Sequence, residues 1–406
     1  FLAVTPVSVI TSRNNTIDSL LVLTVLLGAW AVLRAAETGR LRWLLLCGVL
    51  VGLGFNIKML EAYLVVPAFG LVYLLGARTD WLRRIGHLVL ATVVLLGVSL
   101  SWAVAVDLTP ASARPYVGSS GTNSELNLAL GYNGLQRLTG ALFGRAASGT
   151  TSGGTPTGGG GFGNALFNGG PAGLFRLIGT TLGGQVSWLL ILAVLGLAFA
   201  AMRVPWRRLD GRGRSLVLWG AWLLTAGAFF SVANFFHPYY TVMLAPAIAA
   251  LAAVGVAALW QAYRSKGWRG WLLPLVLLAT AAVQAYILRD YPEWSRWLTP
   301  LVVGGCLVAA LVLSVARLRQ RRALRAALIA AGVAVSVLLA APTTWAAYSV
   351  AHVPNATIPT AGPSAQTADG FGGAGAPGGF GGFGNRPSGA PPVGGAPLAG
   401  RPNTIA

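Results

Sequence analysis

The sequence predicts an all-α polytopic membrane protein, and three observations support that fold class. Hydrophobic residues make up 55% of the 406 residues, charged residues make up only 10%, and the mean hydropathy is +0.67. Soluble domains carry roughly 25% charged residues. Apolar runs of membrane-spanning length alternate with short loops, and arginine clusters occupy every second loop. We therefore expect a helical bundle that crosses a bilayer repeatedly.

The arginine clusters assign a side to each loop. By the positive-inside rule, loops rich in Lys and Arg lie in the cytoplasm. The clusters lie at residues 34–42, 78–84, 203–214, 264–269 and 317–325. The segments between them carry polar, aromatic and acidic residues and are then external. We expect the chemistry of the protein at that extracytoplasmic face of the plasma membrane.

Ten apolar segments follow a short apolar stub that begins at Phe1. The stub is too short to span a bilayer, which takes roughly 20 residues, so we expect a fragment without its natural N-terminus. The ten segments cover residues 18–36, 42–57, 60–76, 86–106, 183–202, 215–232, 238–262, 270–288, 299–316 and 326–346. Residues 1–347 are predicted to form the transmembrane domain, with a long external segment at residues 107–182.

Two stretches are too poor in branched apolar residues to bury a core. Residues 148–170 and 361–400 are rich in glycine. Neither contains the G-K-[ST] sequence of a phosphate-binding P-loop, so we assign their glycines no nucleotide role. We expect both to be flexible external segments, and residues 348–406 to form an external Gly/Pro-rich tail.

The net charge of +19 does not indicate nucleic-acid binding. A strongly basic chain often binds a phosphate backbone, but these arginines are divided among short loops between apolar segments. In that position they orient helices and contact anionic lipid headgroups. We therefore expect a membrane lipid as a partner and no nucleic acid.

The turn from Arg13 to Asp18 begins the first full-length apolar segment. An Asp in the first turn of a helix favours the helix dipole and needs no further role. An acid beside an Arg and two Asn at a membrane surface also suits a hydroxylated or phosphorylated ligand. Both interpretations of Asp18 stay open at this point.

Lys58 and Glu61 have the spacing of an ion pair on one helix face, worth a few tenths of a kcal/mol. Lys58 is also one of two lysines in a chain whose other basic residues are nearly all Arg, and it lies opposite the arginine clusters. A compact ammonium at the bilayer edge suits a lipid phosphate. The two interpretations carry similar weight.

Two further external segments hold candidate substrate-binding residues. The first, from Asp107 to Asn133, is dense in hydrogen-bonding side chains, which a surface loop explains but which would also form a sugar-binding surface. The second contains a His and a Tyr that an interfacial aromatic belt would explain. The candidates are Arg114, Tyr116, Asn123, Tyr132, Asn133, His237 and Tyr239, and Glu61 is a further substrate-binding candidate outside these two segments.

No His, Cys or carboxylate grouping in the sequence has metal-ligand spacing. We name no cofactor with certainty, although a divalent metal ion stays open. A serine nucleophile elbow is not found either.

Several stretches together resemble actinobacterial family 39 glycosyltransferases, which are similar to protein O-mannosyltransferases and to lipid A aminoarabinose transferases. They are R-x-N-x-x-D from Arg13, GxxxGLGFNIKML from Gly48, VDLTPASARPYVGSS from Val106 with NS and GYNG after it, LGGQVSWLL from Leu182, and HPYYTVMLAPAIAAL from His237. The resemblance implies a GT-C membrane fold. It also implies a polyprenyl-phosphate-linked sugar donor and a cell-envelope acceptor, which is a lipid, glycan or protein.

The resemblance also implies roles for individual residues. Asp18 matches the second conserved acid of the family, and Lys58 matches the lysine that faces the phosphate of the donor lipid. His237 and Tyr239 match a basic residue and a tyrosine before a Pro-containing helix. The principal catalytic acid of the family is expected upstream of Phe1, so we expect the fragment itself to be inactive.

The implied reaction is an inverting transfer. An acidic side chain takes the proton of an acceptor hydroxyl as that hydroxyl attacks the anomeric carbon, and the polyprenyl phosphate leaves. Cations such as Lys58 and Arg13 would stabilise the charge that develops on the leaving phosphate. A secondary transporter, which would tend to show internal repeats and midplane charges, and a non-catalytic membrane scaffold are the alternatives.

Overall fold

The computed structural model describes residues 1–118, 120, 122–135, 169–206, 209–233, 236–319, 323–352 and 358–363, except the side chains of residues 132–135. Within these ranges the regular secondary structure is helical and no strand occurs. Residues Phe1–Thr367 form one compact unit. The predicted all-α class is therefore confirmed, whereas the predicted external tail lies almost entirely outside the described residues and stays a prediction.

The long helices begin and end close to the predicted apolar segments. They are α2 (Asp18–Thr38), α3 (Leu41–Lys58), α4 (Val66–Gly76), α5 (Trp81–Leu108), α10 (Leu190–Ala201), α11 (Gly211–Val232), α12 (Ala245–Arg264), α13 (Leu272–Leu288), α14 (Pro292–Leu318) and α15 (Leu324–Ala351). The shorter elements are η1 (Leu2–Val4), α1 (Pro6–Arg13), η2 (Met59–Val65), α6 (Glu125–Asn127), η3 (Leu128–Leu135), η4 (Arg176–Ile178), α9 (Gly183–Val186), η5 (Ser187–Leu189), η6 (Pro238–Leu244) and η7 (Trp268–Trp271).

Nine stretches of the described residues are long and apolar enough to cross a membrane. One of them, Leu41–Gly76, contains two passes, because the chain reverses inside it. The backbone N–H of Arg78 donates to the carbonyl of Ala36 at 3.1 Å, so the start of α3 and the end of α4 lie at the same end of the bundle. The reversal occurs at Met59, whose φ is 45°. All ten predicted apolar segments are thus helical, and the reversal at Met59 separates two of them.

Local sequence signals explain where several helices begin and end. Proline occupies the first turn of α1, η6 and α14, where its missing N–H costs no helical hydrogen bond. Helix α2 ends at Gly39, which has a φ of 68°. A Cβ at this position would lie 2.6 Å from the carbonyl oxygen of Arg78. Only glycine therefore fits this turn without a shift of the backbone.

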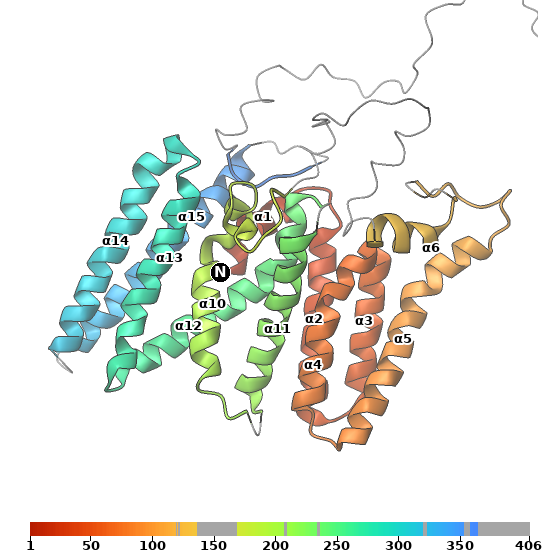
Figure 1. Cartoon of the computed structure of the whole chain (residues 1–406), viewed down its shortest axis with the longest axis horizontal. Helices are drawn as coiled ribbons and strands as arrows, with labels where there is room; N and C mark the ends of the chain where they lie inside the picture. The colour runs from red at the N-terminus through yellow and green to blue at the C-terminus, as the bar shows by residue number, and fades with distance from the viewer. Residues whose placement is uncertain are drawn as a thin grey trace, which may run out of the picture. The chain divides into compact units, whose positions relative to one another are not determined.

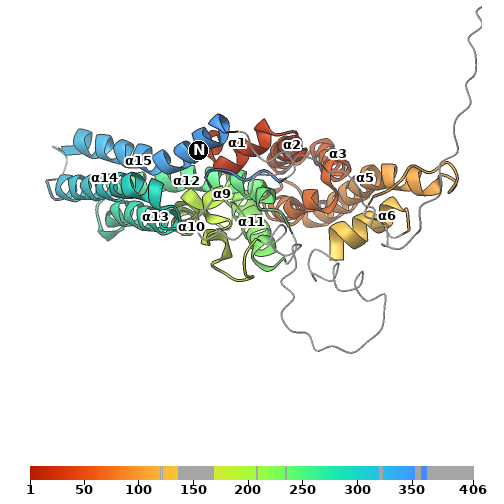
Figure 2. The same cartoon turned by 90° about the horizontal axis from the view of Figure 1, so that it is seen from above.

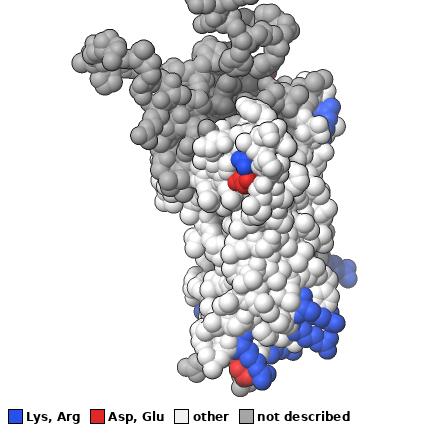
Figure 3. Space-filling view, turned by 90° about the vertical axis from the view of Figure 1, so that its right-hand side faces the viewer, with Lys and Arg blue, Asp and Glu red and all other residues white. Residues whose placement is uncertain are grey.

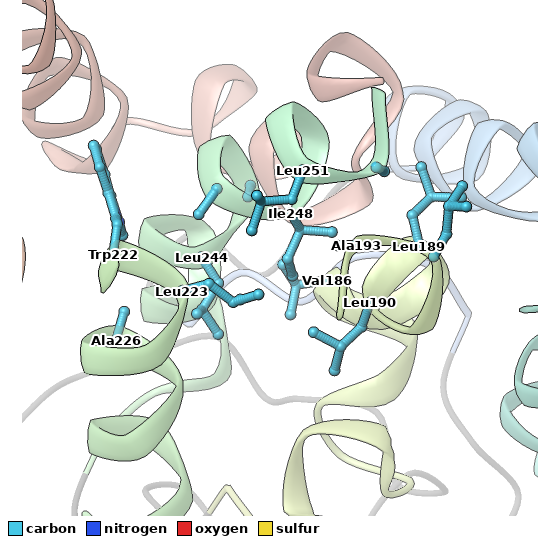
Figure 4. Close-up of a cluster of buried hydrophobic side chains, with 14 of the residues drawn as sticks. Val186, Leu189, Leu190, Ala193, Trp222, Leu223, Ala226, Leu244, Ile248 and Leu251 are labelled. Carbon is cyan, nitrogen blue, oxygen red and sulfur yellow. The ribbon is translucent and has the colours of Figure 1, made fainter. Parts of the chain in front are cut away.

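The helices form three neighbouring groups. Helices α10, α11 and α12 lie between the group α2 to α5 and the group α13 to α15 (Figures 1 and 2). Contacts of α11 with α4 and of α10 with α13 join the groups. The centre packs through apolar side chains of α9, α10, α11 and α12, among them Val186, Ala193, Trp222 and Leu251 (Figure 4). Trp222 is fully buried and donates its indole N–H to the carbonyl of Met243 at 2.8 Å.

The two ends of the bundle differ in charge. The loops that contain the five arginine clusters lie together at one end, which we call the arginine-rich end, and Lys and Arg gather there on the face shown in Figure 3. Arg317 links two of these loops, because it donates to the carbonyl of Tyr263 at 2.6 Å. Asp18 and Lys58 lie at the opposite end, which we call the Asp18 end. The predicted separation of basic loops from the candidate site is therefore present.

Candidate functional site

Asp18 is the first residue of α2, and only 1% of its surface is exposed. The turn before it is held by Thr16, whose hydroxyl donates to the carbonyl of Thr11 at 3.1 Å. A buried carboxylate in a membrane protein is costly unless another charge or a hydrogen bond compensates it. Its partner therefore decides what it can do.

That partner is Lys58, the last residue of α3. Its ammonium donates to Asp18 Oδ1 and also lies 3.1 Å from Glu61 Oε2. The Lys58 side chain is 12% exposed and the two carboxylates are less exposed still. The predicted pair of Lys58 with Glu61 is present, and the chain reversal at Met59 additionally brings Lys58 to Asp18.

Aromatic rings from η6 complete the surroundings of the ammonium. Lys58 Nζ lies 3.5 Å from the centroid of the Tyr240 ring and 5.1 Å from that of Tyr239. The His237 ring stacks on Tyr239 at 5.4 Å with an interplanar angle of 7°. The rings attract the cation through their negative faces. We call Asp18, Lys58, Glu61, Tyr239 and Tyr240 the Lys58 cluster.

The charges of the Lys58 cluster do not cancel. Two carboxylates and one ammonium give a formal charge of −1 in a largely buried position. An ammonium has three N–H donors, and here it faces two carboxylates and a ring. A phosphate that binds Lys58 must therefore displace at least one of these partners. The cluster thus holds two acids that share one ammonium partner.

Arg13, which was predicted to contact a lipid phosphate, binds backbone carbonyls in this structure. Its guanidinium donates to the carbonyls of Ser349 at 2.5 Å and His352 at 2.6 Å. These carbonyls lie at the C-terminal end of α15, where helices leave acceptors without intrahelical partners. Arg13 thereby joins α1 to the last helix of the bundle, and it remains exposed to solvent.

The candidates in the first external segment form a loop that holds itself together. Arg114 donates to the carbonyls of Asp107 at 2.5 Å and Thr109 at 3.1 Å, and Asn123 Oδ1 accepts from the N–H of Val117 at 2.6 Å. The carboxylate of Asp107 accepts from the hydroxyl of Ser124 and the N–H of Glu125, at 2.6 and 2.8 Å. Asp107 thus caps α6, a role that the sequence did not predict.

The remaining candidates of this segment are placed in part. Tyr116 is 88% exposed. The backbone of Tyr132 and Asn133 belongs to η3, which contacts η2 and hence the element that carries Glu61. The side chains of Tyr132 and Asn133 lie outside the described residues. The segment is therefore a neighbour of the Lys58 cluster through η3, and its role in substrate binding stays a prediction.

Arg176 is a buried residue that sequence reasoning missed. It is 6% exposed and donates to the carbonyls of Gly169 at 3.1 Å, Phe230 at 3.2 Å and Ala233 at 2.5 Å. Its guanidinium lies 4.8 Å from the ring centroid of Phe236, the residue before His237. Arg176 therefore fixes the end of α11 and the approach to η6. No sequence motif marks such a role, because all three acceptors are backbone atoms.

Among the described residues, no group of three or more His, Cys, Asp and Glu side chains is placed to hold a metal ion. Asp18 and Glu61 are near each other through Lys58, but their shared partner is the ammonium.

The chain is similar to known proteins at the level of sequence. Residues 1–102, which include Asp18, Lys58 and Glu61, match the family model described as dolichyl-phosphate-mannose-protein mannosyltransferase. Two proteins of Bacillus subtilis (strain 168), named "Putative mannosyltransferase YycA" and "Putative mannosyltransferase YkcB", are 37% and 36% identical to the chain. The resemblance to family 39 glycosyltransferases is confirmed. No solved structure matches the chain.

The two Bacillus subtilis relatives are longer than this chain. The alignments cover 89% and 91% of this chain but 62% of the length of each relative. The chain is thus similar over nearly its whole length to proteins named putative mannosyltransferases, and it spans less than two thirds of their length.

Proposed function

We propose that the whole protein transfers a sugar from a polyprenyl-phosphate-linked donor to a cell-envelope acceptor, with the Lys58 cluster as part of its active site. The observation that carries this proposal is a buried group of two acids and one lysine at one end of a membrane bundle, inside the stretch that matches the mannosyltransferase family. Ionisable groups buried in membrane helices are costly, and they usually serve function.

The arrangement provides the parts that such a transfer needs. A carboxylate, Asp18 or Glu61, accepts the proton of an acceptor hydroxyl while the hydroxyl oxygen forms a bond to the anomeric carbon. The bond between that carbon and the phosphate oxygen breaks, and the polyprenyl phosphate leaves with both electrons. Lys58 offsets the charge on the leaving phosphate. The attack inverts the configuration at the anomeric carbon.

A groove at the Asp18 end of the bundle supports a lipid-linked donor. It has a volume of about 570 Å³ and lies among α1, α2, η6 and α15. Ser12, Arg13 and Ser19 provide polar groups in its lining, while Val22 and Val242 provide apolar ones. Ser19 follows Asp18 directly in the sequence. A donor with a phosphate and an isoprenoid chain requires this combination of polar and apolar surface.

The proposal is tested with the whole protein in proteoliposomes and radiolabelled polyprenyl-phosphate mannose. We expect release of polyprenyl phosphate and labelled acceptor, and a rate lower by about 10²- to 10⁴-fold in Asp18→Asn, the range for loss of a general base. The matched control is Asp80→Asn, because Asp80 is an exposed acid at the arginine-rich end. Labelled solute that crosses the membrane without release of polyprenyl phosphate would favour a transporter and contradict the proposal.

The outer face of the plasma membrane is part of the same proposal. The positive-inside rule places the arginine-rich end in the cytoplasm and the Lys58 cluster outside. The separation of the two ends in the structure supports this orientation. Labelling of introduced cysteines from each side of the membrane tests this orientation directly.

A further inference from the structure

An apolar groove lies between α14 and α15, away from the Lys58 cluster. Its volume is about 500 Å³, within the range of roughly 300–1,000 Å³ that ligand sites have. It is lined by Gly304, Gly305, Val308, Ala309 and Val312 of α14 and by Ala326, Ile329, Ala330 and Val333 of α15. These residues belong to the part of each helix that is nearer the arginine-rich end. The lining offers no charged side chain.

Two arginines, Arg319 directly after α14 and Arg325 in α15, lie between the lining of the groove and the arginine-rich end. Arg325 directly precedes Ala326 in the lining, and Arg319 follows Val312 by seven residues, which is about 10 Å along a helix. Both arginines are exposed, and neither side chain has an ion pair or hydrogen bond within the described part of the chain. Arg317 differs, because it is used to hold the α12 end through the carbonyl of Tyr263.

The sequence around Arg319 and Arg325 contains no acidic residue that could neutralise them. Between Glu293 and Asp369 the sequence contains no Asp or Glu, and none occurs between Asp210 and Asp290. The other half of the arginine-rich end differs in this respect. There Arg34 pairs with Glu37 at 2.9 Å and Arg83 approaches Asp80 at 3.7 Å. The arginines in the half of this end formed by α12 to α15 therefore have no nearby acid in the sequence, and an anion from outside the chain would neutralise them.

We propose that the groove binds an acyl chain of an anionic phospholipid whose phosphate contacts Arg319 and Arg325. An apolar groove with an exposed arginine at the arginine-rich end of each of its two helices matches a molecule with one hydrocarbon part and one anionic part. Trp268, which is 68% exposed, lies on the neighbouring η7, and Trp is enriched at the level of lipid headgroups. The site is separate from the Lys58 cluster and does not depend on the proposed transferase activity.

The test measures lipid binding to the purified chain in neutral detergent by native mass spectrometry. The probes are phosphatidylglycerol and phosphatidylcholine with the same palmitoyl and oleoyl chains. We expect wild-type protein to bind phosphatidylglycerol more tightly. Arg319→Gln/Arg325→Gln should weaken phosphatidylglycerol binding by about 25-fold, from about fivefold per basic residue, with little change for phosphatidylcholine. The control Arg40→Gln/Arg78→Gln removes two exposed arginines from the other half and should keep the preference.

A second variant tests the groove itself. A Cβ at Gly304 would meet no atom within 4 Å, so Gly304→Leu can place its side chain in the groove without disturbing the backbone. It should weaken binding of both lipids, whereas Gly97→Leu, at an equally open position on α5, should weaken neither. Equal binding of the two lipids by wild-type protein, or equal losses in the arginine variant and its control, would overturn the proposal. Displacement of phosphatidylglycerol by glycerol phosphate at equal concentration would also overturn it, because the groove would then contribute nothing.

Discussion

Replacement of Lys58 by Met should destabilise the protein more than any exchange at an exposed ion pair. The change keeps the length of the side chain but removes its charge, so the buried formal charge of the Lys58 cluster becomes −2 instead of −1. Asp18 and Glu61 would then face each other without the ammonium that lies between them. The rings of Tyr239 and Tyr240 cannot replace it, because an aromatic face repels an anion.

The size of the effect follows from the geometry. At the 3.1 Å that separates Lys58 Nζ from Glu61 Oε2, the Coulomb attraction is about 5 kcal/mol for an effective dielectric constant of about 20. Desolvation of the ions offsets part of this. Removal of one partner from a buried pair typically costs about 3–5 kcal/mol in the free energy of unfolding. We expect a loss of about that size in Lys58→Met.

The assay is a double-mutant cycle read from thermal unfolding midpoints in neutral detergent. Lys58→Met/Asp18→Asn restores a formal charge of −1 and should recover part of the loss, with a coupling energy of about 0.5–3 kcal/mol. The control cycle uses Arg34→Met and Glu37→Gln, a pair with side chains that are 47% exposed, for which the coupling should stay below about 1 kcal/mol. If Lys58→Met unfolds at the temperature of the control variants, the ion pairs of the cluster contribute nothing and our account of its electrostatics is wrong.

Three further predictions concern other parts of the chain. Cysteines introduced at the exposed positions Tyr116 and Ser265 should react with a membrane-impermeant reagent from opposite sides, with Tyr116 outside, and the buried Cys47 and Cys306 should give little background; labelling of both from one side would reject the topology. Tyr240→Leu should lower the free energy of unfolding by about 0.5–2 kcal/mol more than Tyr240→Phe does, because both changes remove the hydroxyl but only Phe keeps a ring under Lys58, and equal losses would exclude a cation–π role. Arg176→Gln should lower the midpoint and increase proteolysis near residues 230–240, because buried carbonyls lose a donor at about 1–3 kcal/mol each; unchanged proteolysis would show that Arg176 does not fix that segment.

The passes of the fold could be predicted from the sequence because their signals are local. A run of apolar residues of bilayer length has few alternatives to a helix, since every backbone polar group must be satisfied within the segment. The arginines of the loops likewise predicted which ends lie together. The short 42–57 segment forms a separate helix because the chain reverses at Met59. The positive φ of Met59 could not be predicted from its residue type, because methionine has no preference for that conformation.

The candidate site was predictable only where its members are close in sequence. The spacing of Lys58 and Glu61 indicated an ion pair, and that pair is present. The contact of Lys58 with Asp18 joins residues 40 positions apart, and the contact with Tyr240 depends on how η6 packs against the other helices. Neither distance follows from a pattern in one segment. The sequence therefore identified Asp18, Glu61 and Lys58 as candidates, whereas the packing of the helices brings them into one cluster.

The bond between Arg13 and α15 has a consequence for the order in which the protein is made. Arg13 and Ser349 are 336 residues apart. At a synthesis rate of about 5–20 residues per second, Arg13 leaves the ribosome tens of seconds before its acceptors exist. Asp18 and Lys58, by contrast, are made within a few seconds of each other. The ion pairs of Lys58 with Asp18 and Glu61 are thus available early in membrane insertion, whereas α1 gains its attachment to α15 only when that helix arrives.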